Sequence, residues 1–130
     1  ANNLIEGHIE NLNFPYIIKI HIPNTNNVKV ILHDGNNANM TLVELINLIF
    51  FCSNYSEEID ANFISIYDKI NDKHNYYIER LFGYHIENIN EPDKGLLWRC
   101  YINKKKENWN ILCDNNKIIS RKDEIEFKYE

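Results

Sequence analysis

The chain has 130 residues, of which 44% are hydrophobic and 25% are charged, and its formal net charge is −5 at pH 7. This length suits a single domain, and the hydrophobic share excludes a wholly disordered chain because it is enough to build a core. The scattered Lys and Arg of an acidic chain exclude a broad phosphate-binding surface but leave a local basic patch open, and the longest apolar run (45–51) is too short to cross a bilayer.

The N-terminal part of the chain predicts a lead-in followed by a β-hairpin. Residues 1–13 are expected to be a flexible lead-in, and residues 14–130 to be a single domain. The stretch "YIIKIHI" (16–22) is rich in Ile and partly alternates between apolar and polar residues, as a strand does. "PNTNN" supplies turn residues, and "VKVIL" (28–32) then predicts a second strand that returns beside the first.

A helix is predicted after this hairpin, because Thr41 and Glu44 have the spacing of a capping box. In this motif the Thr hydroxyl accepts a hydrogen bond from the third helical N–H, and the Glu side chain reaches back to the cap. Five apolar residues follow with the helical repeat and form one stripe: Leu42, Leu45, Ile46, Ile49 and Phe50. A helix this short is marginal alone in water, so the stripe must lie on an apolar surface, which the sheet supplies.

The remaining strands are predicted in the second part of the chain. Stretches 63–68 and 76–84 are predicted as the third and fourth strands, separated by the turn sequence "KINDKHN". Stretches 96–102 and 109–113 flank the lysine-rich "NKKKEN" and predict a hairpin, and 123–129 predicts the last strand. One face of this hairpin would carry side chains from both strands: Trp98, Cys100 and Ile102 opposite Trp109, Ile111 and Cys113.

The order of these elements predicts an α+β fold of the ubiquitin-like β-grasp type. In this fold a mixed sheet carries one main helix across one face, and here an extra hairpin precedes the last strand. The first and last strands, 16–22 and 123–129, are expected to lie side by side and to run in the same direction. A ferredoxin-like fold is the alternative, but it needs a second helix near 85–95, where Pro92 and Gly95 oppose one.

The chain shows no recognisable catalytic or cofactor motif, so we expect neither an enzyme nor a bound cofactor or metal. The acidic run 56–60 lacks the spacing of a calcium loop and is expected to be solvated surface. Cys52, Cys100 and Cys113 are odd in number and show no C-x-x-C spacing, which favours a reducing compartment over a disulfide framework. Cys100 and Cys113 alternate with apolar residues in predicted strands, so we expect them to be buried and inert.

The predicted hairpin at 96–113 is the candidate binding site. It places lysines between aromatic residues and so combines positive charge with stacking surface, as single-stranded nucleic-acid binders do. A structural explanation stands beside this hypothesis, in which the lysines form a solvated turn and the tryptophans belong to the core. The candidate partner-binding residues are Trp98, Tyr101, Lys104, Lys105, Lys106 and Trp109.

Five stretches occur in order along residues 14–129: "FPYIIKIHI", "MTLVELINLI", "NFISIYD", "YYIERLFG" and "ISRKDEIEF". Together they resemble the Sin-three-associated eighteen-kilodalton polypeptide family, whose members are ubiquitin-like adaptors. The chain departs from the family pattern in a shortened first connection (23–27) and in a longer segment at 84–108. The positions that carry the resemblance are Thr41, Leu42, Glu44, Leu45, Phe63, Ile66 or Tyr67, Asp68, Tyr76, Ile78, Leu81, Gly83, Ile119, Asp123, Ile125 and Phe127.

The resemblance implies a nuclear, non-enzymatic adaptor subunit, with the cytoplasm as a second location. Family members join Sin-three and histone-deacetylase corepressor assemblies of transcription and a splicing-associated complex. The implied partners are a Sin-three-type scaffold, an acinus- or pinin-type protein and an RNA-recognition-motif splicing factor. Two alternatives stay open: a generic ubiquitin-like docking domain of another pathway, and an RNA-binding module that uses the lysine-rich hairpin.

Overall fold

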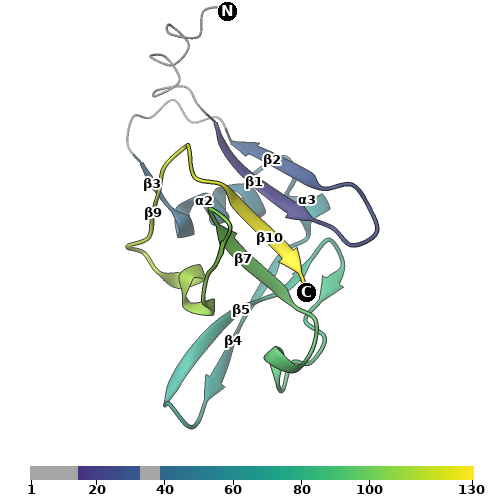
Figure 1. Cartoon of the computed structure of the whole chain (residues 1–130), viewed down its shortest axis with the longest axis vertical. Helices are drawn as coiled ribbons and strands as arrows, with labels where there is room; N and C mark the ends of the chain where they lie inside the picture. Colours follow the sequence, from purple (N-terminus) through teal and green to yellow (C-terminus); the bar gives the residue numbers. More distant parts are fainter. Residues whose placement is uncertain (1–14, 33–38) are drawn as a thin grey trace, which may run out of the picture.

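The computed structural model describes residues 15–32 and 39–130, so the expected lead-in at residues 1–13 lies outside the described residues. Within them the chain forms a mixed α+β fold that is mostly sheet and has one main helix (Figure 1). Its strands form one five-stranded sheet, one three-stranded sheet and one pair of very short strands. The five-stranded sheet, called the main sheet below, positions the candidate site.

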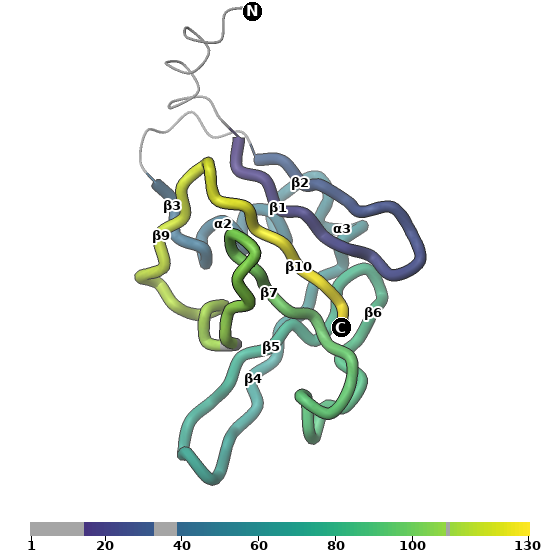
Figure 2. Tube along the Cα trace, in the orientation of Figure 1, coloured from purple at the N-terminus to yellow at the C-terminus, as the bar shows by residue number. Residues whose placement is uncertain are grey.

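The main sheet is mixed, and its first and last strands in sequence lie side by side. Its strands in spatial order are β2 (Val28–Leu32), β1 (Tyr16–His21), β10 (Ile125–Tyr129), β7 (Trp98–Ile102) and β8 (Lys105–Lys106). Strand β1 runs parallel to β10 with Ile18 beside Ile125, and the other neighbours are antiparallel. Figure 2 shows β10 between β1 and β7. The predicted parallel pairing of the first and last strands is therefore confirmed.

The main helix, α2 (Leu42–Phe51), begins at the predicted cap. The Thr41 hydroxyl accepts a hydrogen bond from the Glu44 backbone N–H at 3.2 Å, as the capping box predicts. The Glu44 carboxylate accepts from the Thr41 hydroxyl at 3.1 Å instead of from the cap N–H. Thr41 itself belongs to β3 (Met40–Thr41), which pairs with β9 (Ile118–Ile119), two short strands that the sequence pattern did not reveal.

The stripe of α2 forms the centre of the core. All five predicted stripe residues are buried. The ring centroid of Phe50 lies 5.3 Å from that of Phe127 in β10 and 6.2 Å from that of Phe63. Each fully buried side chain of this kind contributes roughly 1.5–3 kcal/mol before ordering entropy is subtracted. In Figure 1 α2 lies behind the main sheet, so the face of the sheet toward the viewer carries no described helix.

A separate three-stranded sheet extends away from the main sheet toward the bottom of Figure 1. Its strands are β4 (Asn62–Asp68), β5 (Lys73–Leu81) and β6 (Tyr84–His85). The predicted third strand at 63–68 is confirmed as β4. The acidic run 56–60 was expected to be surface. Its first four residues form a short helix, α3 (Ser56–Ile59), whose last residue is buried.

The fourth strand was predicted at 76–84 and lies instead at 73–81. It starts early because the Asp68 carboxylate accepts hydrogen bonds from the backbone N–H groups of Ile70 and Asn71, which closes the turn quickly. It ends early because Phe82 and Gly83 have positive φ angles of 51° and 77°, which reverse the chain into β6.

Residues 109–113 form a 3-10 helix, η2 (Trp109–Cys113), so their prediction as a strand is wrong. Asn103 and Lys104 have positive φ angles of 52° and 70°, so a tight turn returns the chain at once and β8 pairs with β7. The Asn108 side chain then accepts a hydrogen bond at 2.9 Å from the N–H two residues later and starts η2. The hairpin before the last strand is therefore β7–β8.

Candidate functional site

Trp98, the first predicted site residue, lies fully buried in the core. Its indole N–H donates to the Tyr84 backbone carbonyl at 2.9 Å, and its ring centroid lies 5.4 Å from that of Tyr129. The alternation of β7 explains this position, because it turns Trp98, Cys100 and Ile102 inward together. From there the indole cannot stack on a nucleic-acid base.

Tyr101 lies on the opposite face of β7 and is half-buried. Its hydroxyl donates to the Glu130 carboxylate, and the Lys128 ammonium lies 4.7 Å from its ring centroid, a cation–π contact. Lys105 and Lys106 are both exposed in the edge strand β8. Aromatic surface and charge do meet here, but the charge already lies over the ring.

Lys104 occupies the turn between β7 and β8 and binds the Glu126 carboxylate at 2.9 Å. Trp109 opens η2, and its side chain falls outside the described part of the chain. Of the predicted site residues, the structure thus brings Tyr101, Lys104 and Lys106 to one face of the sheet and places Trp98 on the other.

The free face of the main sheet consists of the side chains that point away from α2. Its alternation is clear in β1, where every second residue is fully buried and the residues between them are not. One row of side chains crosses all five strands: Lys29, Lys19, Glu126, Tyr101 and Lys106. The next row holds His21, Lys128 and Arg99.

Glu126 lies at the middle of the first row and is buried, with 3% of its surface exposed. His21 Nε2 lies 2.6 Å from one carboxylate oxygen and Lys104 Nζ lies 2.9 Å from the other. The hydrogen bond from Lys104, opposed by desolvation and helped by His21, lowers the pKa of Glu126 to about 2. The same hydrogen bond raises the pKa of Lys104. Glu126 is therefore ionised at neutral pH, and its charge is matched within the chain.

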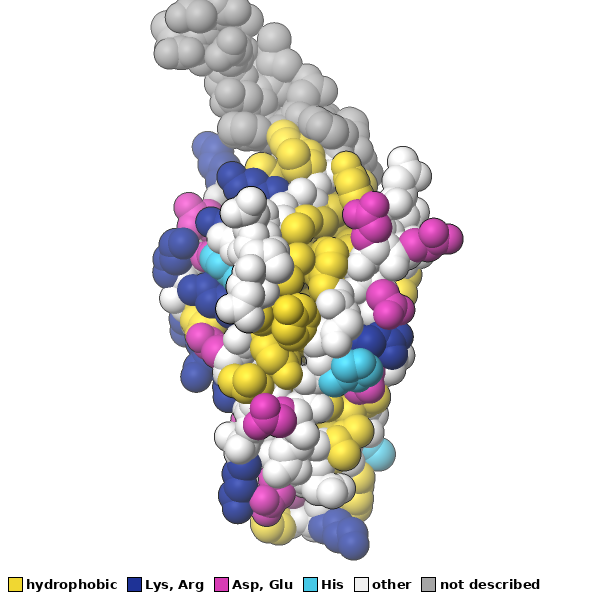
Figure 3. All heavy atoms as spheres, turned by 90° about the vertical axis from the view of Figure 1, so that its right-hand side faces the viewer, with side chains coloured by type: hydrophobic (Ala, Val, Ile, Leu, Met, Phe, Trp, Pro, Cys, Tyr) yellow, Lys and Arg dark blue, Asp and Glu magenta, His cyan; other side chains and the backbone are white. Residues whose placement is uncertain are grey.

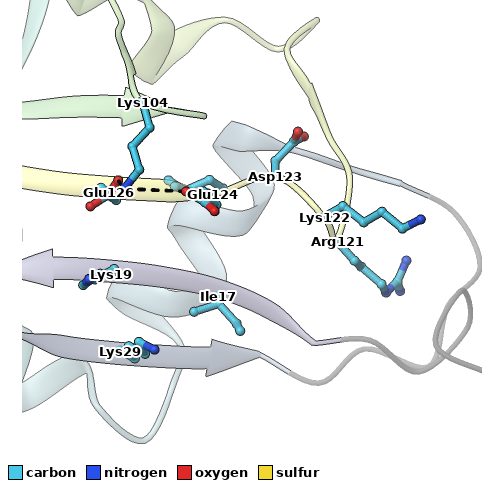
Figure 4. Close-up of a pocket in the computed structure, with 10 residues that line it drawn as sticks. Ile17, Lys19, Lys29, Lys104, Arg121, Lys122, Asp123, Glu124 and Glu126 are labelled. Carbon is cyan, nitrogen blue, oxygen red and sulfur yellow. Dashed lines mark hydrogen bonds and ion pairs between the residues drawn. The ribbon is translucent and has the colours of Figure 1, made fainter. Parts of the chain in front are cut away.

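An open groove of about 530 Å³ lies beside Glu126 on the free face. Figure 4 shows Ile17, Lys19 and Lys29 projecting from β1 and β2. The segment that precedes β10 contributes two basic and two acidic residues to the lining: Arg121, Lys122, Asp123 and Glu124. Ile17 is 38% exposed, and its cross-strand neighbour in β2, Ile31, is 46% exposed. The groove therefore combines aliphatic surface with charges of both signs.

The free face is basic although the chain as a whole is acidic. Figure 3 shows Lys and Arg side chains along the left-hand edge of the molecule, which is the face toward the viewer in Figure 1. Lys19 and Lys29 make no ion pair with any residue that the structure describes, whereas Lys104 is bound to Glu126. The basic residues of the free face are Lys19, Lys29, Arg99, Lys104, Lys106 and Lys128.

The site predicted from sequence did not include Lys19, Lys29 or Glu126. Alternation within the two N-terminal strands was the available signal. It places Lys19 and Lys29 on the face of the sheet away from the buried side chains of β1 and β2. Their position beside Glu126 follows only from the pairing of β1 with β10, which joins distant parts of the chain.

Thiol and metal chemistry have few candidates in the described part of the chain. It contains no group of three or more His, Cys, Asp or Glu side chains placed to hold a metal ion. Burial raises the pKa of Cys100 to about 12, so this thiol is protonated at neutral pH. Cys52 and Cys113 are exposed, which corrects the expectation for Cys113, because its predicted strand is the helix η2.

No family model, curated protein or solved structure matches this chain. Among the described helices, none has the length and apolar character that a membrane span needs. The fold and the groove together define a small mixed α+β domain whose main sheet is covered by a helix on one face and presents an open, charged surface on the other.

Proposed function

We propose that this chain is a non-enzymatic adaptor that holds protein partners on the free face of its main sheet. The observation that carries this proposal is the contrast between the two faces of that sheet. One face is sealed by α2, and the other carries an open groove with lysines that have no ion-pair partner among the described residues. Protein contact sites combine apolar surface with a polar rim, and complementary charge gives them specificity.

The finer fold that we propose is a ubiquitin-like β-grasp. The central order β2-β1-β10-β7, the parallel pair β1–β10 and a single main helix across one face support this assignment. The three-stranded sheet β4-β5-β6 and the turn to β8 are additions to that arrangement.

The resemblance to the Sin-three-associated eighteen-kilodalton polypeptide family supports a more specific role. It points to an adaptor subunit of a nuclear Sin-three and histone-deacetylase corepressor or of a splicing-associated complex. The partners that we propose are a Sin-three-type scaffold, an acinus- or pinin-type protein and an RNA-recognition-motif splicing factor. The segment 84–108, where the chain departs from the family pattern, includes β7 and β8, which form one side of the free face. Of the family's properties, the choice of partner is therefore the one that we expect to differ most in this chain.

The two alternatives differ from this proposal in what they require of the chain. A generic ubiquitin-like docking domain would use the same free face with partners from another pathway. An RNA-binding module would need an exposed stacking platform. The burial of Trp98 and the Lys128 contact over Tyr101 favour a protein partner over single-stranded RNA.

The proposal is tested by purifying the tagged full chain from cells that express it and identifying co-purifying proteins by mass spectrometry. We expect to recover at least one of the three named partner types in a molar amount close to that of the tagged chain. The recovered complex is then acetylated briefly and its lysines are mapped. Lys19, Lys29 and Lys106 should be protected, whereas Lys69 and Lys73 on the distant β4–β5 turn should react as in the free chain. Absence of all three partner types, or protection confined to the control lysines, overturns the proposal.

A further inference from the structure

We infer that the groove on the free face binds an extended acidic segment of a partner protein, in which a Glu or Asp side chain stands two residues from an aliphatic side chain. This inference rests on the proposed function and adds to it the chemistry of the bound segment.

The acidic character follows from Lys19 and Lys29. They lie opposite each other in the antiparallel pair of β1 and β2, both line the groove, and neither is paired with a described carboxylate. Cross-strand neighbours have Cβ atoms about 4.5–5.5 Å apart, so two ammonium groups reach one anionic group together. Lys104 already neutralises Glu126, and Arg121 stacks over the Tyr16 ring. The lining cations that make no ion pair with a described carboxylate include Lys19, Lys29 and Lys122, and of these Lys19 and Lys29 lie side by side on the sheet.

The aliphatic position follows from Ile17 and Ile31. These two side chains are neighbours across β1 and β2, and both are substantially exposed on a sheet whose other face buries its isoleucines. Ile17 precedes Lys19 by two residues, so both lie on one face about 6.6–7 Å apart along the strand. An extended peptide repeats its side chains at the same interval. A carboxylate at Lys19 and Lys29 therefore places an aliphatic side chain at Ile17 and Ile31.

The groove fits a peptide better than a nucleic acid. Its described lining holds the exposed Ile17 and no aromatic ring, whereas single-stranded nucleic acids bind by stacking on aromatic rings. Asp123 and Glu124 line the same groove, and a phosphate backbone carries a negative charge at every step and would meet them. A peptide can place a neutral or basic residue at that point. Mixed charge thus selects for a segment whose charges vary along its length.

The test measures binding of a fluorescent peptide that repeats Glu-Ser-Val-Ser to the full chain by fluorescence anisotropy. In an extended conformation this probe presents Glu and Val on one face at the required interval. Three matched probes are measured beside it: Lys-Ser-Val-Ser repeats reverse the charge, Glu-Ser-Ser-Ser repeats remove the aliphatic group, and oligouridylate supplies a phosphate backbone. We expect the first probe to bind most tightly and its affinity to fall as salt is raised.

Two pairs of variants locate the binding. Lys19→Gln with Lys29→Gln is expected to weaken binding of the first probe about tenfold, the effect of losing roughly two charge-assisted contacts. Ile17→Thr with Ile31→Thr keeps β-branched residues in both strands and should weaken it several-fold. The matched controls lie on the β4–β5 turn. Lys69→Gln with Lys73→Gln changes the net charge equally, Ile70→Thr removes an isoleucine that is 94% exposed, and neither should alter binding.

The inference is overturned if the groove variants bind the first probe like the wild type, if the charge-reversed probe binds equally well, or if oligouridylate binds more tightly and loses affinity in the same variants. A failure of the proposed function looks different, because no partner protein is then recovered with the wild-type chain. If a partner is recovered and the Lys19→Gln, Lys29→Gln chain retains it fully, the adaptor role stands and this inference alone fails.

Discussion

The two faces of the main sheet are built by the same strands but differ in the chemistry of their side chains. On the covered face the isoleucines of β1 share one hydrophobic core cluster with the stripe of α2 and Phe127. On the free face the alternate residues of those strands are Lys, His and Glu, with Ile17 and Ile31 at one end. The comparison teaches that the covered face holds the fold together, whereas the free face is available for recognition because the fold depends on it little.

Removal of the Phe50 ring should have the largest effect. Phe50→Ala empties the contact with Phe127 and Phe63 and should lower the free energy of unfolding by about 3–5 kcal/mol, measured by urea denaturation. The neighbouring Phe51→Ala is the control, because Phe51 is 45% exposed, and it should cost about 1 kcal/mol or less. Equal losses for the two variants would show that the covered face does not dominate stability.

Glu126 is the point where the free face contributes to folding. Glu126→Gln removes the charge that Lys104 and His21 bind and should lower the free energy of unfolding by about 1–2 kcal/mol at pH 7, with allowance for screening near the exposed Lys104.

The pH dependence of this loss gives a sharper check. The folded-state pKa of Glu126 is lowered from 4.5 to about 2, so its contribution is fully present above pH 4.5 and disappears as the pH falls toward 2. Urea denaturation of the wild type and Glu126→Gln should therefore give values that converge over this interval. A gap that persists unchanged at the acid end would contradict the ion-pair explanation.

Loss of the helix cap should cost less. Thr41→Ala removes the hydroxyl that accepts the Glu44 N–H and should lower the free energy of unfolding by about 1 kcal/mol. Thr41→Ser keeps the hydroxyl and should recover most of this loss. If both substitutions cost the same, the pairing of β3 with β9, not the cap, determines the effect.

The smallest effect is expected from the free-face lysines. Lys19→Gln with Lys29→Gln should change the free energy of unfolding by no more than about 0.5 kcal/mol, because neither ammonium is bound to a described carboxylate. Thermal and urea unfolding both measure this. A substantial loss would mean that these lysines are structural, and it would remove the distinction between the two faces.

Local patterns were sufficient for the elements that carry the core. Period-two alternation located β1 and β2, and the capping box with its stripe located α2. The strand prediction at 109–113 failed because "WNILC" has the same apolar content as a strand, while the Asn108 side chain bends it into a helix. A side-chain hydrogen bond of this kind competes with strand pairing and leaves no trace in hydrophobic periodicity.

The candidate site was only partly predictable for a different reason. Lysines and tryptophans that are close in sequence predicted a binding site at 96–113, but strand alternation places Trp98 and Tyr101 on opposite faces of the sheet. The residues that do form the groove come from β1, β2 and β10, and only the parallel pairing brings them together. Long-range register decides which charges become neighbours, and a local window does not contain it.

The parallel pair β1–β10 also constrains how the domain is made in the cell. During synthesis β1, β2 and α2 emerge well before β10. The apolar stripe of α2 can therefore pack only against β1 and β2 while the later strands of the main sheet are still missing. Contacts between such distant segments form slowly, since a long loop must close first. A nascent chain of this protein therefore exposes part of this apolar stripe until β10 pairs between β1 and β7.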